Sequence, residues 1–143
     1  MKILVLNGPN INLLGLREPE IYGSTSYDEL CNLINQHCKI KNIEVEIFQS
    51  NIEGELINKI HEAYFNKING IVINAGGYTH TSVSILDALK ATKIKTVDVH
   101  ISNINQRDDF RKINLIKEAC IDSIVGKGIE GYILAIDTLL NRG

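Results

Sequence analysis

The chain has 143 residues, of which 44% are apolar and 22% are charged, and its formal net charge at pH 7 is −2. These values are typical of a globular domain, and they predict a single domain over residues 1–143. The slight negative charge argues against nucleic acid or an acidic membrane as a main partner, since both select a basic face. No apolar run approaches the length of a membrane span.

Strand patterns and helix patterns alternate along the chain. Short apolar runs predict strands at Ile3–Leu6, Val45–Phe48, Gly70–Ile73, Lys95–Ile101 and Ser123–Val125. Amphipathic patterns predict helices after the capping signatures Ser26–Glu29 and Ser50–Glu53, from about Thr81 to Ala91, near Asp108–Lys112, and over Gly128–Leu140. This alternation implies right-handed crossovers between parallel strands. We therefore expect a flavodoxin-like α/β fold, with a five-stranded parallel sheet in the order 2-1-3-4-5 and helices on both faces.

Polar residues gather directly after the predicted strands. They occupy residues 7–12, 74–82 and 98–103, whereas the turns after the helices are plain polar connectors. Sheets of this type bind ligands beyond the carboxyl ends of their strands, where the strand order reverses. The distribution therefore predicts a functional site at that edge of the sheet.

The connection from Asn7 to about Thr25 is long for a compact domain, where loops of more than about 12–15 residues are uncommon and often functional. It carries Asn12, Arg17, Glu18 and Tyr22. We expect this loop to act as a lid over the site, with its chemistry centred on Tyr22.

Other kinds of site find little support. Neither phosphate-loop motif is present, although Gly126-Lys127-Gly128 before a helix could bind an anion. Metal ligation is not expected, because His80 and His100 fall on different loops with no third ligand at a typical spacing. The three cysteines, Cys31, Cys38 and Cys120, form no C-x-x-C pair and are interpreted as buried thiols in a reducing cytosol.

Several separated blocks, in one consistent order along almost the whole chain, resemble the type II 3-dehydroquinate dehydratases. The blocks are Asn7–Gly15, Arg17–Pro19, Tyr22-Gly23, Gln49–Asn51, Glu53–Ile57, Tyr78–Ser82, Val99–Asn103 and Phe110-Arg111. The resemblance implies a cytoplasmic enzyme of the shikimate route to aromatic amino acids, with a single catalytic domain over residues 1–143. Its reaction would remove water from 3-dehydroquinate, through an enolate, to give 3-dehydroshikimate.

The same resemblance assigns catalytic roles. Tyr22 would take the proton from the carbon beside the ketone, and Arg17 would hold Tyr22 as tyrosinate. Asn12 would help to hold a water against the enolate oxygen, and His100 would protonate the departing hydroxyl.

The resemblance also implies how substrate is held. Asn74, His80, Arg111 and the Ile101-Ser102 backbone would grip its carboxylate and hydroxyls, and Asp87 would reach the site of a neighbouring subunit. The family assembles as a dodecamer, a tetramer of trimers, and uses no metal, no cofactor and no Schiff base.

Elementary electrostatics supports the base and the acid. Shifting a tyrosine from its free pKa of about 10 to about 7 requires about 4 kcal/mol of preference for the anion. One Arg about 4 Å away supplies on the order of 4 kcal/mol at an effective dielectric near 20. Asp98 and His100 are two residues apart on a strand, so they leave the same face, and the carboxylate can orient the imidazole and favour its charged form.

The chain departs from the family pattern at three single positions and in one short segment. Asp98 stands where Glu is usual, Ala75 where Pro is usual, Ile52 where His is common, and Asn114-Leu115 replaces a segment that contains Ser. Two other functions are also open: a flavodoxin-like module that binds a flavin or a small acid, and a structural subunit whose site has decayed. The loop after the first strand lacks a hydroxyl-rich phosphate cradle, and intact Arg17, Tyr22 and His100 argue against decay.

Overall fold

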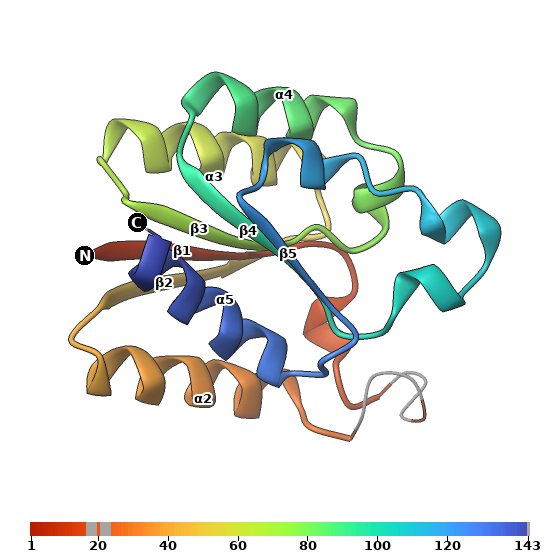
Figure 1. Ribbon diagram of the computed structural model, residues 1–143, viewed down its shortest axis with the longest axis horizontal. Coiled ribbons are helices and arrows are strands. Elements are labelled where there is room, and N and C mark those ends of the chain that lie inside the picture. The colour runs from red at the N-terminus through yellow and green to blue at the C-terminus, as the bar shows by residue number, and fades with distance from the viewer. Residues whose placement is uncertain (17–19, 21–23, 143) are drawn as a thin grey trace.

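The structure, a computed structural model, describes residues 1–16, 20 and 24–142. Its centre is a five-stranded parallel sheet in the order β2-β1-β3-β4-β5, which confirms the predicted flavodoxin-like topology (Figure 1). The strands are β1 (Lys2–Asn7), β2 (Glu44–Gln49), β3 (Gly70–Asn74), β4 (Lys95–His100) and β5 (Asp122–Val125).

Helices cover both faces of this sheet: α2 and α5 lie on one side and α3 and α4 on the other (Figure 1). The helices are α2 (Tyr27–Ile40), α3 (Glu53–Phe65), α4 (Val83–Thr92) and α5 (Glu130–Arg142). Short 3₁₀ helices interrupt the loops at the carboxyl edge: η1 (Ile11–Leu13), η2 (Gly76–His80), η3 (Ile104–Gln106), η4 (Asp109–Lys112) and η5 (Ile116–Ala119). Each helix in the described part of the chain is too short or too polar to cross a lipid bilayer.

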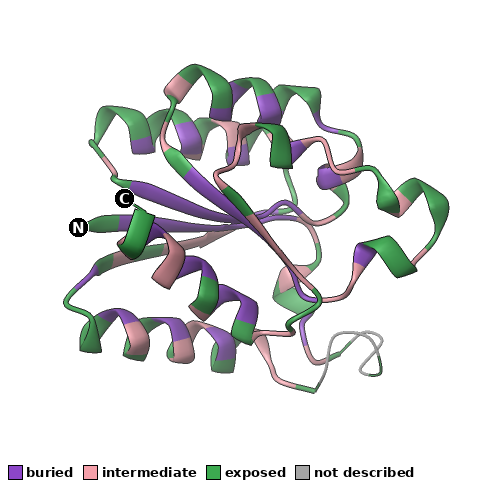
Figure 2. Cartoon of the chain, viewed as in Figure 1, coloured by how far each residue is buried: buried purple, intermediate pink, exposed green. Residues whose placement is uncertain are grey.

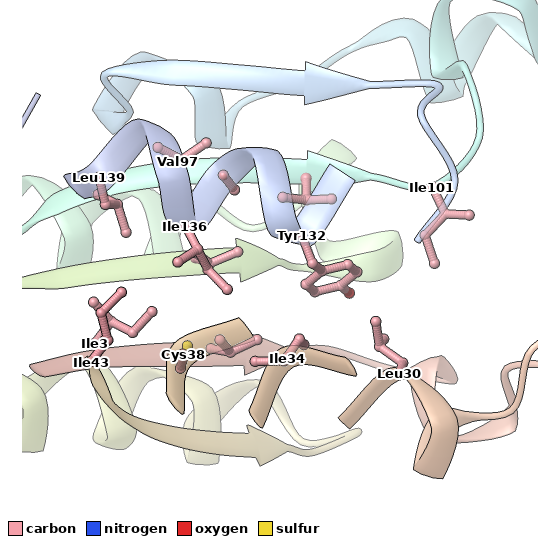
Figure 3. Close-up of a cluster of buried hydrophobic side chains, with 14 of the residues drawn as sticks. Ile3, Leu30, Ile34, Cys38, Ile43, Val97, Ile101, Tyr132, Ile136 and Leu139 are labelled. Carbon is pink, nitrogen blue, oxygen red and sulfur yellow. The ribbon is translucent and has the colours of Figure 1, made fainter. Parts of the chain in front are cut away.

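The central strands are buried on both faces, as Figure 2 shows, because each face has its own apolar cluster. Side chains alternate along a strand. Ile3 and Val5 of β1 therefore pack toward α2 and α5 (Figure 3), whereas Leu4 and Leu6 pack toward α3 and α4. Burial of each such side chain stabilises the fold by about 1.5–3 kcal/mol. The continuous apolar run of β1 follows from this two-sided burial.

The helix starts agree only partly with the sequence prediction. Ser26 caps α2 by accepting a hydrogen bond from the Glu29 N–H at 3.1 Å, as predicted. The second predicted cap is wrong: α3 has Ile52 at its N-cap, and Ser50 forms a turn before the helix by accepting from the Ile52 N–H. α4 begins two residues later than predicted, because η2 runs to His80 and Ser82 provides the cap.

The loops that follow β1 and β3 are in backbone contact. The Gly8 N–H donates to the Asn74 carbonyl at 2.8 Å, and a Cβ built on Gly8 would lie 2.4 Å from the Ala75 carbonyl oxygen. Only glycine permits this approach. The contact places two of the polar segments side by side at the carboxyl edge of the sheet.

Candidate active site

A cavity of about 170 Å³ opens at the carboxyl edge of the sheet, between the segments that follow β1, β3 and β4. It lies where the strand order reverses, between β1 and β3, as the fold rule predicts. Six of the residues assigned to the site line it: Asn74, His80, His100, Ile101, Ser102 and Arg111.

Two further assigned residues, Asn12 and Asp87, are not among the described residues that line the cavity. Asn12 is exposed on η1, and its neighbour Ile11 lines the cavity instead. Asp87 is exposed on α4. Arg17 and Tyr22 lie outside the described residues.

Asp98 and His100 form a buried pair at the end of β4. His100 Nε2 lies 2.6 Å from Asp98 Oδ2, and the two side chains are 6% and 1% exposed. Burial raises the pKa of Asp98, but the hydrogen bonds with His100 and Asn114 outweigh it and hold the pKa below its usual value of 3.8. Asp98 is therefore a carboxylate at neutral pH, able to orient the imidazole as the strand spacing predicts.

His80 is oriented by a backbone carbonyl group. Its Nδ1 lies 2.6 Å from the carbonyl oxygen of Ile113, which can only accept, so Nδ1 carries a hydrogen. The other ring nitrogen, Nε2, is then the one that can meet a ligand in the cavity.

Arg111 brings a positive charge to the cavity. It lies on η4, with its guanidinium carbon 5.0 Å from the centroid of the Phe110 ring. Among the described residues, its buried Nε makes no hydrogen bond, and Asp108 Oδ2 is 3.6 Å away. A planar guanidinium with donors to spare suits a carboxylate ligand.

A chain of hydrogen bonds in the protein interior holds the Asn74 side chain in place. Asn74 Nδ2 donates to the Tyr132 hydroxyl at 3.0 Å, and that hydroxyl donates to Asn7 Oδ1 at 2.7 Å. Asn7 Nδ2 in turn donates to the Tyr27 hydroxyl at 3.3 Å. Burial raises the pKa of Tyr27 to about 12 and raises that of Tyr132 further still, so both phenols stay protonated.

Sequence reasoning did not assign several of these residues. Asn10 and Arg107 also line the cavity, and both lie in or near segments already marked as polar. Tyr132 lies on an amphipathic helix and carries no sequence signal of its own. Among the described residues, no group of three or more His, Cys, Asp or Glu side chains is placed to hold a metal ion.

The doubly wound parallel sheet, the cavity at its reversal point, and the acid–imidazole pair beside an arginine define an α/β enzyme for a small polar substrate. Comparison with known proteins makes this class specific. A family model described as "Dehydroquinase class II" matches residues 1–140.

Two curated relatives are both described as 3-dehydroquinate dehydratases. The protein from Fusobacterium nucleatum is 58% identical over 142 residues, which cover 98% of this chain and 97% of that protein. The protein from Clostridium perfringens is 53% identical, with 99% of both chains covered.

A solved structure agrees with them. The crystal structure of type II dehydroquinase from Butyrivibrio crossotus matches with a TM-score of 0.97 at 57% identity, covering 98% of this chain and 97% of that one. The chain belongs to the class II dehydroquinases, the type II 3-dehydroquinate dehydratases, which are hydro-lyases of the shikimate pathway.

Proposed function

We propose that this cavity binds 3-dehydroquinate and that Tyr22 and His100 remove water from it. Tyrosinate takes a proton from the carbon beside the ketone, and the electron pair moves onto the ketone oxygen as an enolate. The enolate then re-forms the ketone while the carbon–oxygen bond of the neighbouring hydroxyl breaks. His100 protonates the departing oxygen, so that water and 3-dehydroshikimate are released. The buried Asp98–His100 pair, whose histidine lines the cavity, is the observation that carries this proposal.

The covalent path of the chain supports a role for Tyr22 and Arg17. Leu14 lines the cavity, and a Cβ built on the next residue, Gly15, would lie 3.1 Å from the carbonyl oxygens of both Ser24 and Thr25. The chain thus leaves and returns beside the cavity. Tyr22 comes two residues before Ser24 in the sequence. In this proposal Arg17 stabilises the tyrosinate.

Asn12 is proposed to hold a water against the enolate oxygen, since η1 borders the cavity through Ile11. The substrate carboxylate and hydroxyls would be held by the Arg111 guanidinium, His80 Nε2, the Asn74 side chain and the backbone of Ile101 and Ser102. All of these residues line the cavity. No cofactor enters the scheme.

Asp87 is given a role that needs a second copy of the chain. Its carboxylate is exposed on α4 and is absent from the residues that line this chain's own cavity. We propose that it approaches the cavity of a neighbour in a dodecamer built as a tetramer of trimers. Each chain would form one catalytic domain over residues 1–143 in the cytoplasm. Light scattering would test the assembly, and full activity from a monomer would refute the shared site.

The reaction is tested by adding 3-dehydroquinate and following the ultraviolet band of the conjugated enone product. We expect Tyr22→Phe and His100→Ala each to abolish turnover without unfolding the protein. Tyr64→Phe and His61→Ala, which change exposed residues of α3, serve as matched controls and should retain activity. Saturable binding by folded wild-type protein without enone formation would refute the proposal and leave only a binding module. An active Tyr22→Phe variant would refute the base assignment.

A further inference from the structure

Asn114 contacts both members of the buried acid–imidazole pair. Its Nδ2 donates to Asp98 Oδ2 at 2.8 Å and lies 3.2 Å from His100 Nε2. Because the ring nitrogen is 2.6 Å from the same Oδ2, the proton between them belongs to Nε2–H. Two N–H groups therefore converge on one carboxylate oxygen.

The orientation of Asn114 is fixed from its other side. Its Oδ1 accepts the backbone N–H of Lys117 at 3.1 Å, which settles the amide with Nδ2 facing Asp98. The residues on either side of Asn114 are both hydrogen-bonded to η2. His80 Nδ1 donates to the Ile113 carbonyl at 2.6 Å, and the Leu115 N–H donates to the Thr79 carbonyl at 2.9 Å. The amide is thus held in place before any substrate binds.

The Ser123 hydroxyl on β5 is an alternative hydrogen-bond partner for the Asp98 carboxylate, and Asn114 acts against that alternative. Asp98 pairs in register with Ser123 on β5. Among the described residues, Asp98 Oδ1 and Ser123 Oγ are buried and neither makes a hydrogen bond. A buried carboxylate oxygen without a donor is costly, so rotation of the carboxylate toward the Ser123 hydroxyl is a competing arrangement. The hydrogen bond from Asn114 to Oδ2 opposes that rotation.

We propose that Asn114 is a positioning residue of the dehydration reaction: it locks the Asp98 carboxylate so that His100 stays bonded through Nε2 and delivers its proton from Nδ1. The inference rests on the proposed function, in which His100 is the acid. The imidazolium Nδ1–H passes its proton to the departing hydroxyl as the carbon–oxygen bond breaks. The ring then remains as the Nε2–H form on Asp98 and regains its Nδ1 proton from solvent.

Two substitutions distinguish the hydrogen bond that Asn114 donates to Asp98 from the one that it accepts from the Lys117 N–H. Asn114→Leu removes both the donor and the acceptor at similar volume. Asn114→Asp keeps an acceptor for the Lys117 N–H but cannot donate to Asp98. We expect both substitutions to lower kcat on the order of ten-fold, which is part of the rate enhancement that a general acid contributes. KM should stay nearly unchanged, because Asn114 acts through His100 and does not hold the substrate. Asn69→Leu is the matched control, since Asn69 Oδ1 accepts the Lys2 N–H at the opposite end of the sheet.

Two further measurements respond to positioning and not to folding. In wild-type protein, the His100 Nε2–H proton should give a protected NMR signal, and in Asn114→Leu it should exchange with water at least about ten-fold faster. Adding Ser123→Ala to Asn114→Leu removes the competing partner of Asp98 and should restore part of kcat. Among the described residues, the other ionisable groups that line the cavity or interact with Asp98 are His80, Arg107, Arg111 and Cys120, and they are the same in every variant.

The outcomes are distinct. An Asn114→Leu enzyme with wild-type kcat or an unchanged His100 signal would overturn the proposal. A fully active Asn114→Asp enzyme would show that Asn114 only caps η5. If His100→Ala were active, the acid assignment would fail, whereas the NMR comparison would still report whether Asn114 holds the pair.

Discussion

The Tyr132 hydroxyl on the last helix donates a hydrogen bond to Asn7 Oδ1 at the end of the first strand, over 2.7 Å and 125 residues of sequence. The ring is fully buried among aliphatic side chains of α2, α5 and the sheet (Figure 3). The same hydroxyl accepts from Asn74, which lines the cavity. One phenol therefore ties the closing helix to both strands at which the strand order reverses.

Tyr132→Phe should test this link. The variant leaves Asn7 Oδ1 and Asn74 Nδ2 without a buried partner, so we expect the free energy of unfolding to fall by about 1–3 kcal/mol. KM should rise because Asn74 loses its support. Urea unfolding and steady-state kinetics measure the two effects. Tyr64→Phe removes an exposed hydroxyl and should change neither quantity; equal losses in both variants would show that the buried chain contributes nothing specific.

The buried carboxylate of Asp98 should give a recognisable pH dependence of stability. Its pKa in the folded protein lies below the usual 3.8, so Asp98 stabilises the fold above that pH, and the contribution is lost as pH falls through the folded pKa. Asp98→Asn removes this dependence. The wild-type protein should gain stability relative to the variant as pH rises from about 2.5 and level off near about 5. Urea unfolding at a series of pH values measures the gap, and a gap that narrows with rising pH would contradict the assignment.

The strands and the edge that bears the site are predictable from sequence because they depend on local patterns. Two-sided burial makes Ile3–Leu6 a continuous apolar run, and polar residues at strand ends mark the edge where ligands bind. The pairing of Asp98 with His100 follows from the two-residue alternation of a strand. These features need no knowledge of distant contacts.

The position of Asn114 could not be predicted in this way. It lies in an irregular stretch between η4 and η5 that has neither strand nor helix periodicity. Its place is set by hydrogen bonds of its two neighbours: the Ile113 carbonyl accepts from His80, and the Leu115 N–H donates to the Thr79 carbonyl, both partners lying more than thirty residues earlier in the chain. Likewise, the partner of the Tyr132 hydroxyl is chosen by packing of α5 on the sheet. The sequence pattern shows that Tyr132 is on the buried face and does not show what its oxygen meets.

Gly8→Ala should be strongly destabilising. The new Cβ would lie 2.4 Å from the Ala75 carbonyl oxygen, a backbone atom that cannot move aside without separating the loops after β1 and β3. We expect a loss of more than about 2 kcal/mol in the free energy of unfolding, together with loss of activity. Gly54→Ala in α3 is the matched control, because nothing lies within 4 Å of its added Cβ. It should be neutral or stabilising by up to about 1 kcal/mol. A stable, active Gly8→Ala protein would mean that the two loops are not in the contact described.

The three thiols should react slowly in the folded protein and in a defined order. Burial raises the pKa of Cys38 to about 11 and raises the pKa values of Cys31 and Cys120. At pH 8, a thiol of pKa 11 is only about 0.1% thiolate, and the thiolate is the reactive form. Labelling with a disulfide reagent should therefore be much slower than in urea, where all three cysteines react. Mass spectrometry of partly labelled protein should find Cys31 modified first, since Cys38 is fully buried and the pKa of Cys120 is raised furthest. Modification of Cys38 or Cys120 ahead of Cys31 would contradict this order.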